Sequence, residues 1–254
     1  MSRTRRIRAE AVAAWHSFLR RRTAVFFTFF FPVLLVVIFG ALVRTQPTGG
    51  GLFAEPAAYY IPGYLATVVL FTPLSRVGSE IARHRDDNRF EKLATTPLGR
   101  GEWLLAHTLV NVAIIGLASL LILGLVVVLT GAAVPITPRL ALLGPFIVGA
   151  VVLFCGFGAI LGRLSSTQDG VIAASNTIAF PLLFLSDTFV TLELLPGWFA
   201  PLVDLSPLTY FARGVRALTY GPAIETPYGR ELAVVAVLAI VFFVAGAYAI
   251  PRTD

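Results

Sequence analysis

Long apolar windows separated by short charged segments run through the whole sequence. Each window holds about twenty residues with almost no ionised side chain. At ~1.5 Å rise per helical residue, a window of this length covers the ~30 Å hydrocarbon core of a bilayer. The pattern therefore predicts an all-α integral membrane protein with six transmembrane helices. The expected spans are Ala24–Val43, Ala58–Val77, Trp103–Leu129, Leu140–Leu161, Gly170–Val190 and Glu231–Ile250.

The distribution of Lys and Arg orients these spans, because the cytoplasmic flanks of membrane helices carry an excess of basic residues. With the N-terminus inside, fifteen of the 20 basic residues fall on inside segments and five on outside segments. Both termini are therefore expected in the cytoplasm, and the number of spans is expected to be even. The inside set is Arg3, Arg5, Arg6, Arg8, Arg20, Arg21, Arg22, Arg76, Arg83, Arg85, Arg89, Lys92, Arg100, Arg163 and Arg252.

Composition excludes a soluble globule. Hydrophobic residues make up 57% of the 254 residues and charged residues only 13%, against about 25% charged residues in a typical soluble domain. The single cysteine, Cys155, lies inside an apolar window, so a disulfide framework is impossible. The net charge of +6 concentrates beside the spans, which indicates membrane topology rather than nucleic-acid binding.

The N-terminal segment, 3–22, is predicted to form a helix that lies in the membrane interface. Its apolar side chains recur on one helical face, while arginines and His16 lie largely on the other. Such a helix rests its apolar face at the headgroup boundary, a depth that suits Trp15. The alternative is that the arginines only set topology. The apolar face comprises Ile7, Ala11, Trp15, Phe18 and Leu19.

The longest charged stretch is the expected inside loop, 79–102. Ile81, Phe90 and Leu93 predict a short amphipathic helix within it, which ends near Pro97. A solvated loop is the alternative, yet a connection between two helices usually needs only a few residues. The length and charge of this loop therefore predict a docking surface for a cytoplasmic partner.

The expected outside segment, 191–229, is too apolar for a free loop and too broken for a span. Pro196, Pro201 and Pro207 divide it into pieces too short to cross a membrane. Irregular backbone at membrane depth is tolerated where protein buries it. We therefore expect a re-entrant or interfacial helical hairpin, on the extracellular side, before the last span. Its apolar residues include Leu194, Leu195, Trp198, Phe199, Leu202 and Leu205.

The sequence carries no motif for an energy source of its own. A GxxxxGK[ST] phosphate loop and a GxSxG nucleophile elbow are both absent, and no His or Cys cluster has the spacing of metal ligands. No acidic residue lies in the middle of an expected span, as a proton relay would require. The chain is therefore predicted to have no catalytic site, to bind no metal or cofactor itself and to be driven by another subunit.

A few polar and small residues inside the spans are candidates for packing or for a path. His107 and Asn111 share a face of one span, and Asn176 lies in another. Such groups usually join helices to one another, and lining a transport path is the second interpretation. Gly158 and Gly162 form a GxxxG motif, which permits close helix packing.

Two motifs outside the spans are informative. The inside loop reads RDDNRFEKLATTP, and the outside segment reads LSDTFVTLELLPGWFAPLVDLSPLTYFARGVRAL. With the six spans they resemble the type-2 ABC exporter family, the permease class of drug, lipid and polysaccharide export systems. Asn88 and Arg89 stand where that family usually has Gly-Thr. The matching residues are Phe90, Glu91, Lys92, Leu93, Thr96 and Pro97, then Leu195, Pro196, Pro207, Leu208, Thr209, Tyr210 and Arg216.

The resemblance implies that 1–254 is a single transmembrane permease domain of an ATP-driven exporter of an amphiphilic substrate, a drug, lipid or glycan. A second permease, identical or different, and separately encoded ATPase subunits that bind ATP and Mg would complete the transporter. Its location would be the plasma membrane of a prokaryote. The inside loop would couple to the ATPase through Phe90, Glu91, Lys92 and Leu93.

The resemblance also implies that the outside hairpin is a lid over the substrate exit. Its residues would be Leu195, Pro196, Trp198, Pro207 and Tyr210. A competing interpretation is a membrane scaffold or assembly factor without transport, which would have no ATPase partner. An integral-membrane enzyme would need polar residues clustered at one depth, and the sequence shows no such cluster.

Overall fold

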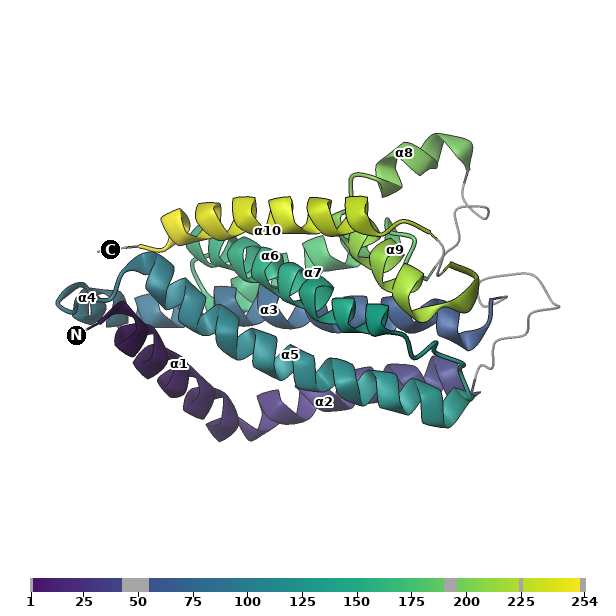
Figure 1. Ribbon diagram of the computed structural model, residues 1–254. Helices are drawn as coiled ribbons and strands as arrows, with labels where there is room; N and C mark the ends of the chain where they lie inside the picture. The colour runs from purple at the N-terminus through teal and green to yellow at the C-terminus, as the bar shows by residue number, and fades with distance from the viewer. Residues whose placement is uncertain (1, 43–54, 190–195, 224–225, 252–254) are drawn as a thin grey trace.

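Long helices running side by side form the molecule, and the computed structural model describes residues 2–42, 55–189, 196–223 and 226–251. All regular elements in these ranges are helical, which confirms the predicted all-α class. Both chain ends lie at one end of the bundle, here called the terminal end, and the distal end lies opposite (Figure 1). The main helices are α1 (Arg3–Arg20), α2 (Arg22–Leu35), α3 (Ile61–Asp86), α4 (Arg89–Ala94), α5 (Arg100–Thr130), α6 (Leu143–Leu164), α7 (Gln168–Phe184), α8 (Ala200–Val203), α9 (Pro207–Thr219) and α10 (Gly229–Ala249).

Short segments of tighter or wider helix extend several of these elements. A π-helical stretch continues α2, and 3-10 turns lead into α3, α6 and α8 or follow α9. Proline is tolerated in the first turn of a helix, because its fixed φ suits the helix and its missing N–H would have no partner there. Such positions are occupied by Pro62, Pro201 and Pro207. The additional segments are η1 (Val36–Leu42), η2 (Ala57–Tyr60), η3 (Pro138–Leu142), η5 (Gly197–Phe199) and η6 (Gly221–Ala223).

Five helical segments of the described ranges are long and apolar enough to cross a membrane, and each overlaps a predicted span. The sixth prediction, 170–190, falls on α7, which has 17 residues. This helix ends early because Ser186 and Thr188 both donate hydrogen bonds to the Leu183 carbonyl oxygen, at 2.6 and 3.1 Å. The five segments are Arg22–Gly40, Ala57–Asp86, Arg100–Thr130, Pro138–Leu164 and Gly229–Ala249.

Glycines let α6 approach both α3 and α10 closely. A Cβ on Gly162 would lie 2.7 Å from the carbonyl oxygen of Gly78 in α3. On the other face of α6, a Cβ on Gly246 of α10 would lie 2.5 Å from the carbonyl oxygen of Gly156. Gly158 faces the backbone of α3 in the same way. The close packing expected from the GxxxG motif is therefore confirmed, with α3 as the partner helix.

The N-terminal helix α1 lies obliquely along the first half of α5 (Figure 1). Phe18 is buried against Val110 and Ile114 of α5, whereas Leu19 of the same predicted apolar face remains 46% exposed. Part of the apolar face expected to meet the membrane interface is thus covered by protein, because α1 folds back over the bundle.

The connection between α3 and α5 is shorter than the inside loop expected at 79–102. Residues 79–86 continue α3, and α5 already begins at Arg100. Glu80 pairs with Arg83 and His84, which lie three and four positions further on the same helix. Pairs at this spacing stabilise a helix, so the charged sequence extends the span instead of leaving it.

The predicted outside segment, 191–229, is helical where it is described. The 13-residue α9 packs into the bundle with Leu208, Phe211 and Val215 buried. The four-residue α8 stands away from the bundle at the distal end (Figure 1). Neither helix is long enough to cross a membrane, as the prolines predicted.

Candidate functional site

A cavity of about 1070 Å³ lies between α2, α3 and α7, with the end of α1 at one margin. Its volume is at the upper end of the range of small-molecule sites. Its wall is mainly apolar and rich in phenylalanine, and Phe27, Phe31, Phe180 and Phe184 are also exposed at its open side. The aromatic lining is formed by Phe18, Phe27, Phe31, Phe39, Phe71, Phe180, Phe184 and Phe189.

Polar side chains line the part of the cavity nearer the terminal end. Arg76, Ser79 and Glu80 come from α3, and Gln168 begins α7. Glu80 forms ion pairs with Arg83, with His84 Nε2 at 3.3 Å and with Arg21 Nη1 at 3.7 Å. The cavity is thus amphipathic, with an apolar aromatic chamber and a charged end.

The guanidinium of Arg76 is held by two side chains from neighbouring helices. Its Nη1 donates a hydrogen bond of 3.4 Å to Asn111 Oδ1, and its Cζ lies 4.5 Å above the Phe18 ring. Asn111 is 1% exposed and donates in turn to the His107 carbonyl oxygen at 2.9 Å. These contacts fix the orientation of a cation that lines the cavity.

The predicted path-lining residues separate in the structure. His107 and Asn176 both line the cavity, whereas Asn111 lies behind Arg76. From the sequence, Arg76 was counted with the inside basic residues, although it falls near the end of the expected span Ala58–Val77. In the structure it lies well within α3, which continues to Asp86. The sequence signal for a charge inside the span was the position of this basic residue, one residue before the end of the apolar window.

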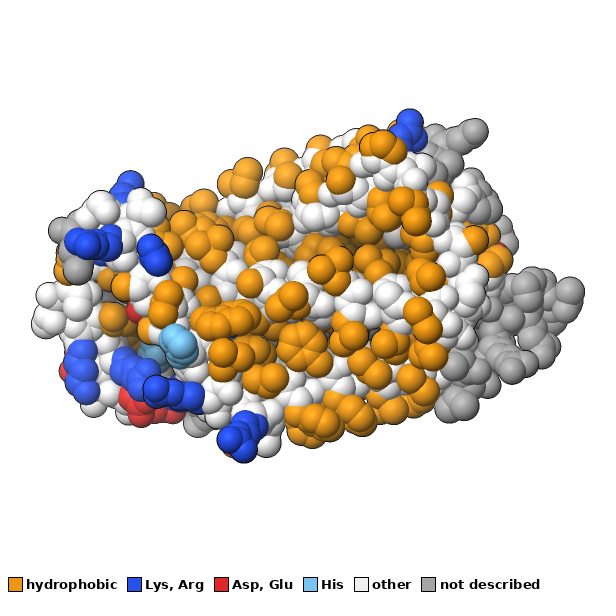
Figure 2. Space-filling model, turned by 60° about the horizontal axis from the view of Figure 1, so that its bottom comes forward, with side chains coloured by type: hydrophobic (Ala, Val, Ile, Leu, Met, Phe, Trp, Pro, Cys, Tyr) orange, Lys and Arg blue, Asp and Glu red, His pale blue; other side chains and the backbone are white. Residues whose placement is uncertain are grey.

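A second cluster of charged and aromatic side chains joins α1, α3, α4 and α5 at the terminal end. Glu10 Oε1 lies 3.3 Å from His107 Nε2, and this hydrogen bond lowers the pKa of Glu10 below its ordinary value. A pocket of about 330 Å³ between these helices is lined by Glu10, Glu80, His84 and His107. The charged surface of this end is visible at the left of Figure 2, beside a broad hydrophobic face.

Within this cluster, Phe90 attaches α4 to the bundle. Phe90 is 4% exposed, and its ring centroid lies 5.5 Å from that of His84 and 5.8 Å from that of Trp103. Asn88, just before α4, has a φ of 52°, in the left-handed region that favours glycine and that asparagine tolerates. This explains how asparagine can occupy the position where the resembled family usually has glycine.

The predicted coupling residues therefore point in different directions. Glu91 and Lys92 are exposed, Leu93 is half-buried and Phe90 faces the core. Phe90 was predicted to couple to the ATPase, and its burial leaves little of its ring for direct contact with a partner. Phe90 is the one aromatic residue of this six-residue helix and faces the bundle.

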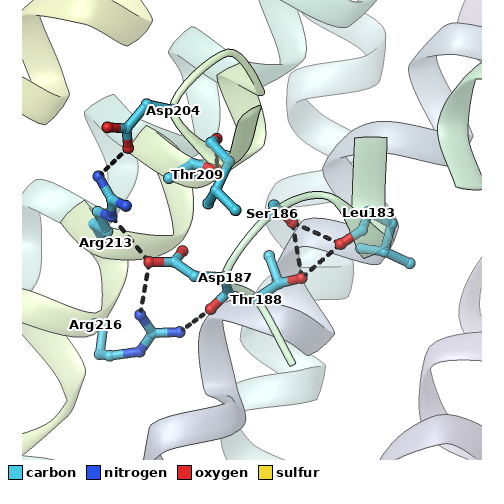
Figure 3. A network of polar contacts seen from close by, with 9 residues as sticks. Leu183, Ser186, Asp187, Thr188, Asp204, Thr209, Arg213 and Arg216 are labelled. Atoms are coloured by element: carbon cyan, nitrogen blue, oxygen red, sulfur yellow. Dashed lines mark hydrogen bonds and ion pairs between the residues drawn. The ribbon is translucent and has the colours of Figure 1, made fainter. Parts of the chain in front are cut away.

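At the distal end, Asp187 connects the segment after α7 with α9 (Figure 3). Arg213 Nε donates to Asp187 Oδ2 at 2.9 Å, and its Nη1 donates to Asp204 Oδ1 at 2.8 Å. Arg216 Nη2 donates to the Asp187 carbonyl oxygen at 2.6 Å, and its Cζ lies 4.1 Å from the Tyr59 ring centroid. We call Asp187, Asp204, Arg213 and Arg216 the Asp187 network.

Sequence reasoning did not identify this network. Asp187 is 4% exposed and Arg216 is 8% exposed, so both charges are buried. The spacing of Arg213 and Arg216 on one helical face was a signal, but their carboxylate partner is 26 to 29 residues away along the chain. The network fixes α9 against the end of α7.

The predicted lid residues fall into two groups. Pro196 and Trp198 are exposed beside α8, where Trp198 is 72% exposed. Pro207 begins α9, and Tyr210 Oη donates to the Asp204 carbonyl oxygen at 2.9 Å. Leu195 lies outside the described residues. The structure thus brings Tyr210 to the Asp187 network and leaves Trp198 apart from it.

The comparisons with known proteins agree with this architecture. The model of the ABC-2 type transporter family matches residues 5–220. The daunorubicin resistance ABC transporter permease protein DrrB1 of Streptomyces coeruleorubidus is 29% identical over 251 residues, covering 92% of this chain and 85% of that protein. The chain therefore belongs to the ABC-2 type transporter family and is a membrane permease subunit of an ABC exporter.

Proposed function

We propose that the cavity between α2, α3 and α7 is the path by which this exporter subunit moves an amphiphilic substrate. The observation that carries the proposal is the cavity itself, about 1070 Å³ with an aromatic chamber and a charged end. A molecule with an apolar body and a polar group fits both parts. The relative's name, a daunorubicin resistance permease, supports a substrate of this amphiphilic class.

The chain crosses the membrane six times in this proposal, with α7 as the sixth span. Its 17 residues cover about 26 Å, and seventeen residues is near the lower limit for a transmembrane helix. Both termini lie at the same end of the bundle, as an even number of crossings requires (Figure 1). The excess of Lys and Arg at that end supports a cytoplasmic location for it. The membrane in this proposal is the plasma membrane of a prokaryote.

A second permease subunit covers the open side of the cavity. Phe27 and Phe31 of α2 and Phe180 and Phe184 of α7 are exposed there, and α2 is little buried along its length. Two copies that meet along these helices would enclose one path between them. An identical partner satisfies this geometry, and a different permease with a similar face also would.

The ATPase partner docks on α4, because this helix stands at the terminal end with Glu91 and Lys92 exposed. ATP and Mg bind to that partner, and the chain has no ATPase site of its own. Phe90 does not touch the ATPase in this arrangement. It transmits movement of α4 to His84 and Trp103, with which its ring is packed.

The distal segment serves as a lid over the exit of the path. The Asp187 network holds α9 in place, while the exposed Pro196 and Trp198 lie on the part that stands away from the bundle. A cysteine at Trp198 should change its reactivity with an impermeant thiol reagent during ATP turnover. Full labelling throughout the cycle would exclude a gating role.

The proposed ATPase coupling is tested by purification of the tagged full-length chain from native membranes in mild detergent. The eluate is assayed for vanadate-sensitive ATP hydrolysis. The wild-type chain and the control Arg230→Ala, an exposed charge near the distal end, should retain the ATPase. The double variant Glu91→Ala with Lys92→Ala should lose it. A wild-type chain without ATPase in several detergents would support the scaffold interpretation instead.

A further inference from the structure

Arg76 carries a charge deep in a membrane-spanning segment. It lies ten residues before the end of the span Ala57–Asp86, which is about 15 Å along the helix. Arginine within a transmembrane segment is costly, and it usually pairs with a carboxylate or faces a water-filled cavity. Arg76 lines the cavity, so it faces the proposed substrate path.

The protein supplies Arg76 with neutral contacts. Asn111 Oδ1 accepts one of its hydrogen bonds, and the Phe18 ring lies beneath the guanidinium. In the described part of the chain no carboxylate oxygen lies within ion-pair distance of Arg76. Guanidinium has five N–H donors in a planar fork that matches a carboxylate or phosphate. Glu80 attracts Arg76 from one helical turn away, but among the described residues these donors have no carboxylate within contact distance.

The nearest acidic side chain, Glu80, is occupied by other cations. Arg83, His84 and Arg21 all form ion pairs with it. Its negative charge is therefore compensated by cations, although Glu80 and Arg21 both line the charged end of the cavity. An acidic group that enters the cavity would meet Arg76 and Arg21, with Glu80 already paired.

Beyond Arg76 the cavity is mostly apolar and aromatic, with threonines such as Thr67 and Thr72 between the rings. Phe71, Phe180 and Phe184 line it on the side of the distal end. A single molecule could place an acid on Arg76 and an apolar body among these rings. The neutral side chains of Ser75 and Gln168 at the charged end could donate further hydrogen bonds to the acid.

We propose that the cavity selects amphiphiles with an acidic headgroup, a carboxylate or a phosphate, which Arg76 binds by charge-assisted hydrogen bonds. Asn111 is a positioning residue, since it orients the guanidinium from behind. The proposal rests on the proposed role of the cavity as the substrate path and adds the chemical class of the substrate.

The test uses two fluorescent probes of equal length, dodecanoic acid and dodecylamine that each carry the same nitrobenzoxadiazole group at the far end. Binding to the full-length chain with its co-purified ATPase is measured by fluorescence anisotropy in phosphatidylcholine nanodiscs. The wild-type protein should bind the acid at least tenfold more tightly than the amine. Equal binding of the two probes, or a preference for the amine, would overturn the proposal without any variant.

Substitutions then test which residues recognise the acidic headgroup. Arg76→Gln should weaken binding of the acid about tenfold, whereas Arg76→Lys should keep it within about threefold. The control Arg163→Gln removes an exposed charge on α6 and should change nothing. Asn111→Ala should weaken the acid probe severalfold and leave the amine unchanged. An Arg76→Gln protein that elutes as a folded complex and binds the acid like wild type would refute the role of Arg76.

The outcomes separate this inference from the proposed function. Retention of the ATPase depends on α4, not on Arg76. Loss of acid preference with the ATPase retained would refute only the headgroup assignment. A chain that binds the acid but brings no ATPase would refute the coupling part of the proposed function.

Discussion

Replacement of Gly162 by alanine tests whether backbone contact between α3 and α6 holds the bundle together. The new Cβ would lie 2.7 Å from the carbonyl oxygen of Gly78 and 2.9 Å from its Cα. Ordinary contacts begin at 3.4 Å, so the two helices must separate by about 0.7 Å. The obstructing atoms belong to backbone and cannot rotate away.

The expected magnitude combines two opposing effects. Overpacking of a well-packed contact costs about 1–3 kcal/mol of folding free energy. The upper end of this range applies here, because backbone atoms block relaxation of the contact. Alanine is a better helix former than glycine by about 1 kcal/mol, which offsets part of this cost. The net expectation is a loss of about 2 kcal/mol, or about 4–8 °C in the unfolding midpoint for a chain of this size.

The control is Gly116→Ala in the middle of α5, where a Cβ would meet nothing within 4 Å. This variant has the same gain in helix propensity without the clash, so its midpoint should stay or rise. The single Cys155 is buried in α6 and serves as the reporter, since a fluorogenic maleimide reaches it only when α6 leaves the bundle. Midpoints are read from labelling during a thermal ramp in detergent.

Equal midpoints for wild type and Gly162→Ala would refute the close α3–α6 contact. If Gly116→Ala lowered the unfolding midpoint by the same amount, the effect of Gly162→Ala would reflect a general intolerance of alanine rather than the α3–α6 contact. The variant Gly156→Ala provides a second case, because its Cβ would collide with the backbone of α10 at Phe242.

Three further predictions concern the polar clusters. Asp187→Ala leaves the buried Arg216 without its carboxylate and should cost about 3–5 kcal/mol in the Cys155 labelling assay; an unchanged midpoint would contradict the ion pairs. Phe90→Ala should reduce substrate-stimulated ATP hydrolysis about tenfold while Phe90→Leu keeps most of it, and equal rates would separate Phe90 from coupling. The His107 hydrogen bond lowers the pKa of Glu10 in the folded protein below its ordinary value of 4.5. Ionised Glu10 therefore contributes its full stabilisation of the fold above pH 4.5, and this stabilisation is lost as the pH falls through the lowered pKa. Glu10→Gln should flatten that acid limb in a tryptophan-fluorescence titration, and an unchanged limb would argue against the contact.

The apolar windows by themselves determined the helical membrane class and located five spans, because bilayer thickness fixes the length of a crossing helix. Four of these spans agree within a few residues at both ends, whereas the second continues to Asp86. The two loop motifs also determined the family, which the match over residues 5–220 bears out. Gly158 and Gly162 predicted a close helix contact, because small residues let the backbones of two helices approach each other. These signals are local in the chain.

Tertiary structure alone decided where the polar side chains meet. Arg76 became a cavity residue because α2 and α7 surround this part of α3, and Phe90 became a core residue because α4 folds onto Trp103. The Asp187 network joins residues from different helices. A sequence pattern reports the periodicity of one helix, whereas such contacts depend on the order and rotation of helices against one another, which no single segment encodes.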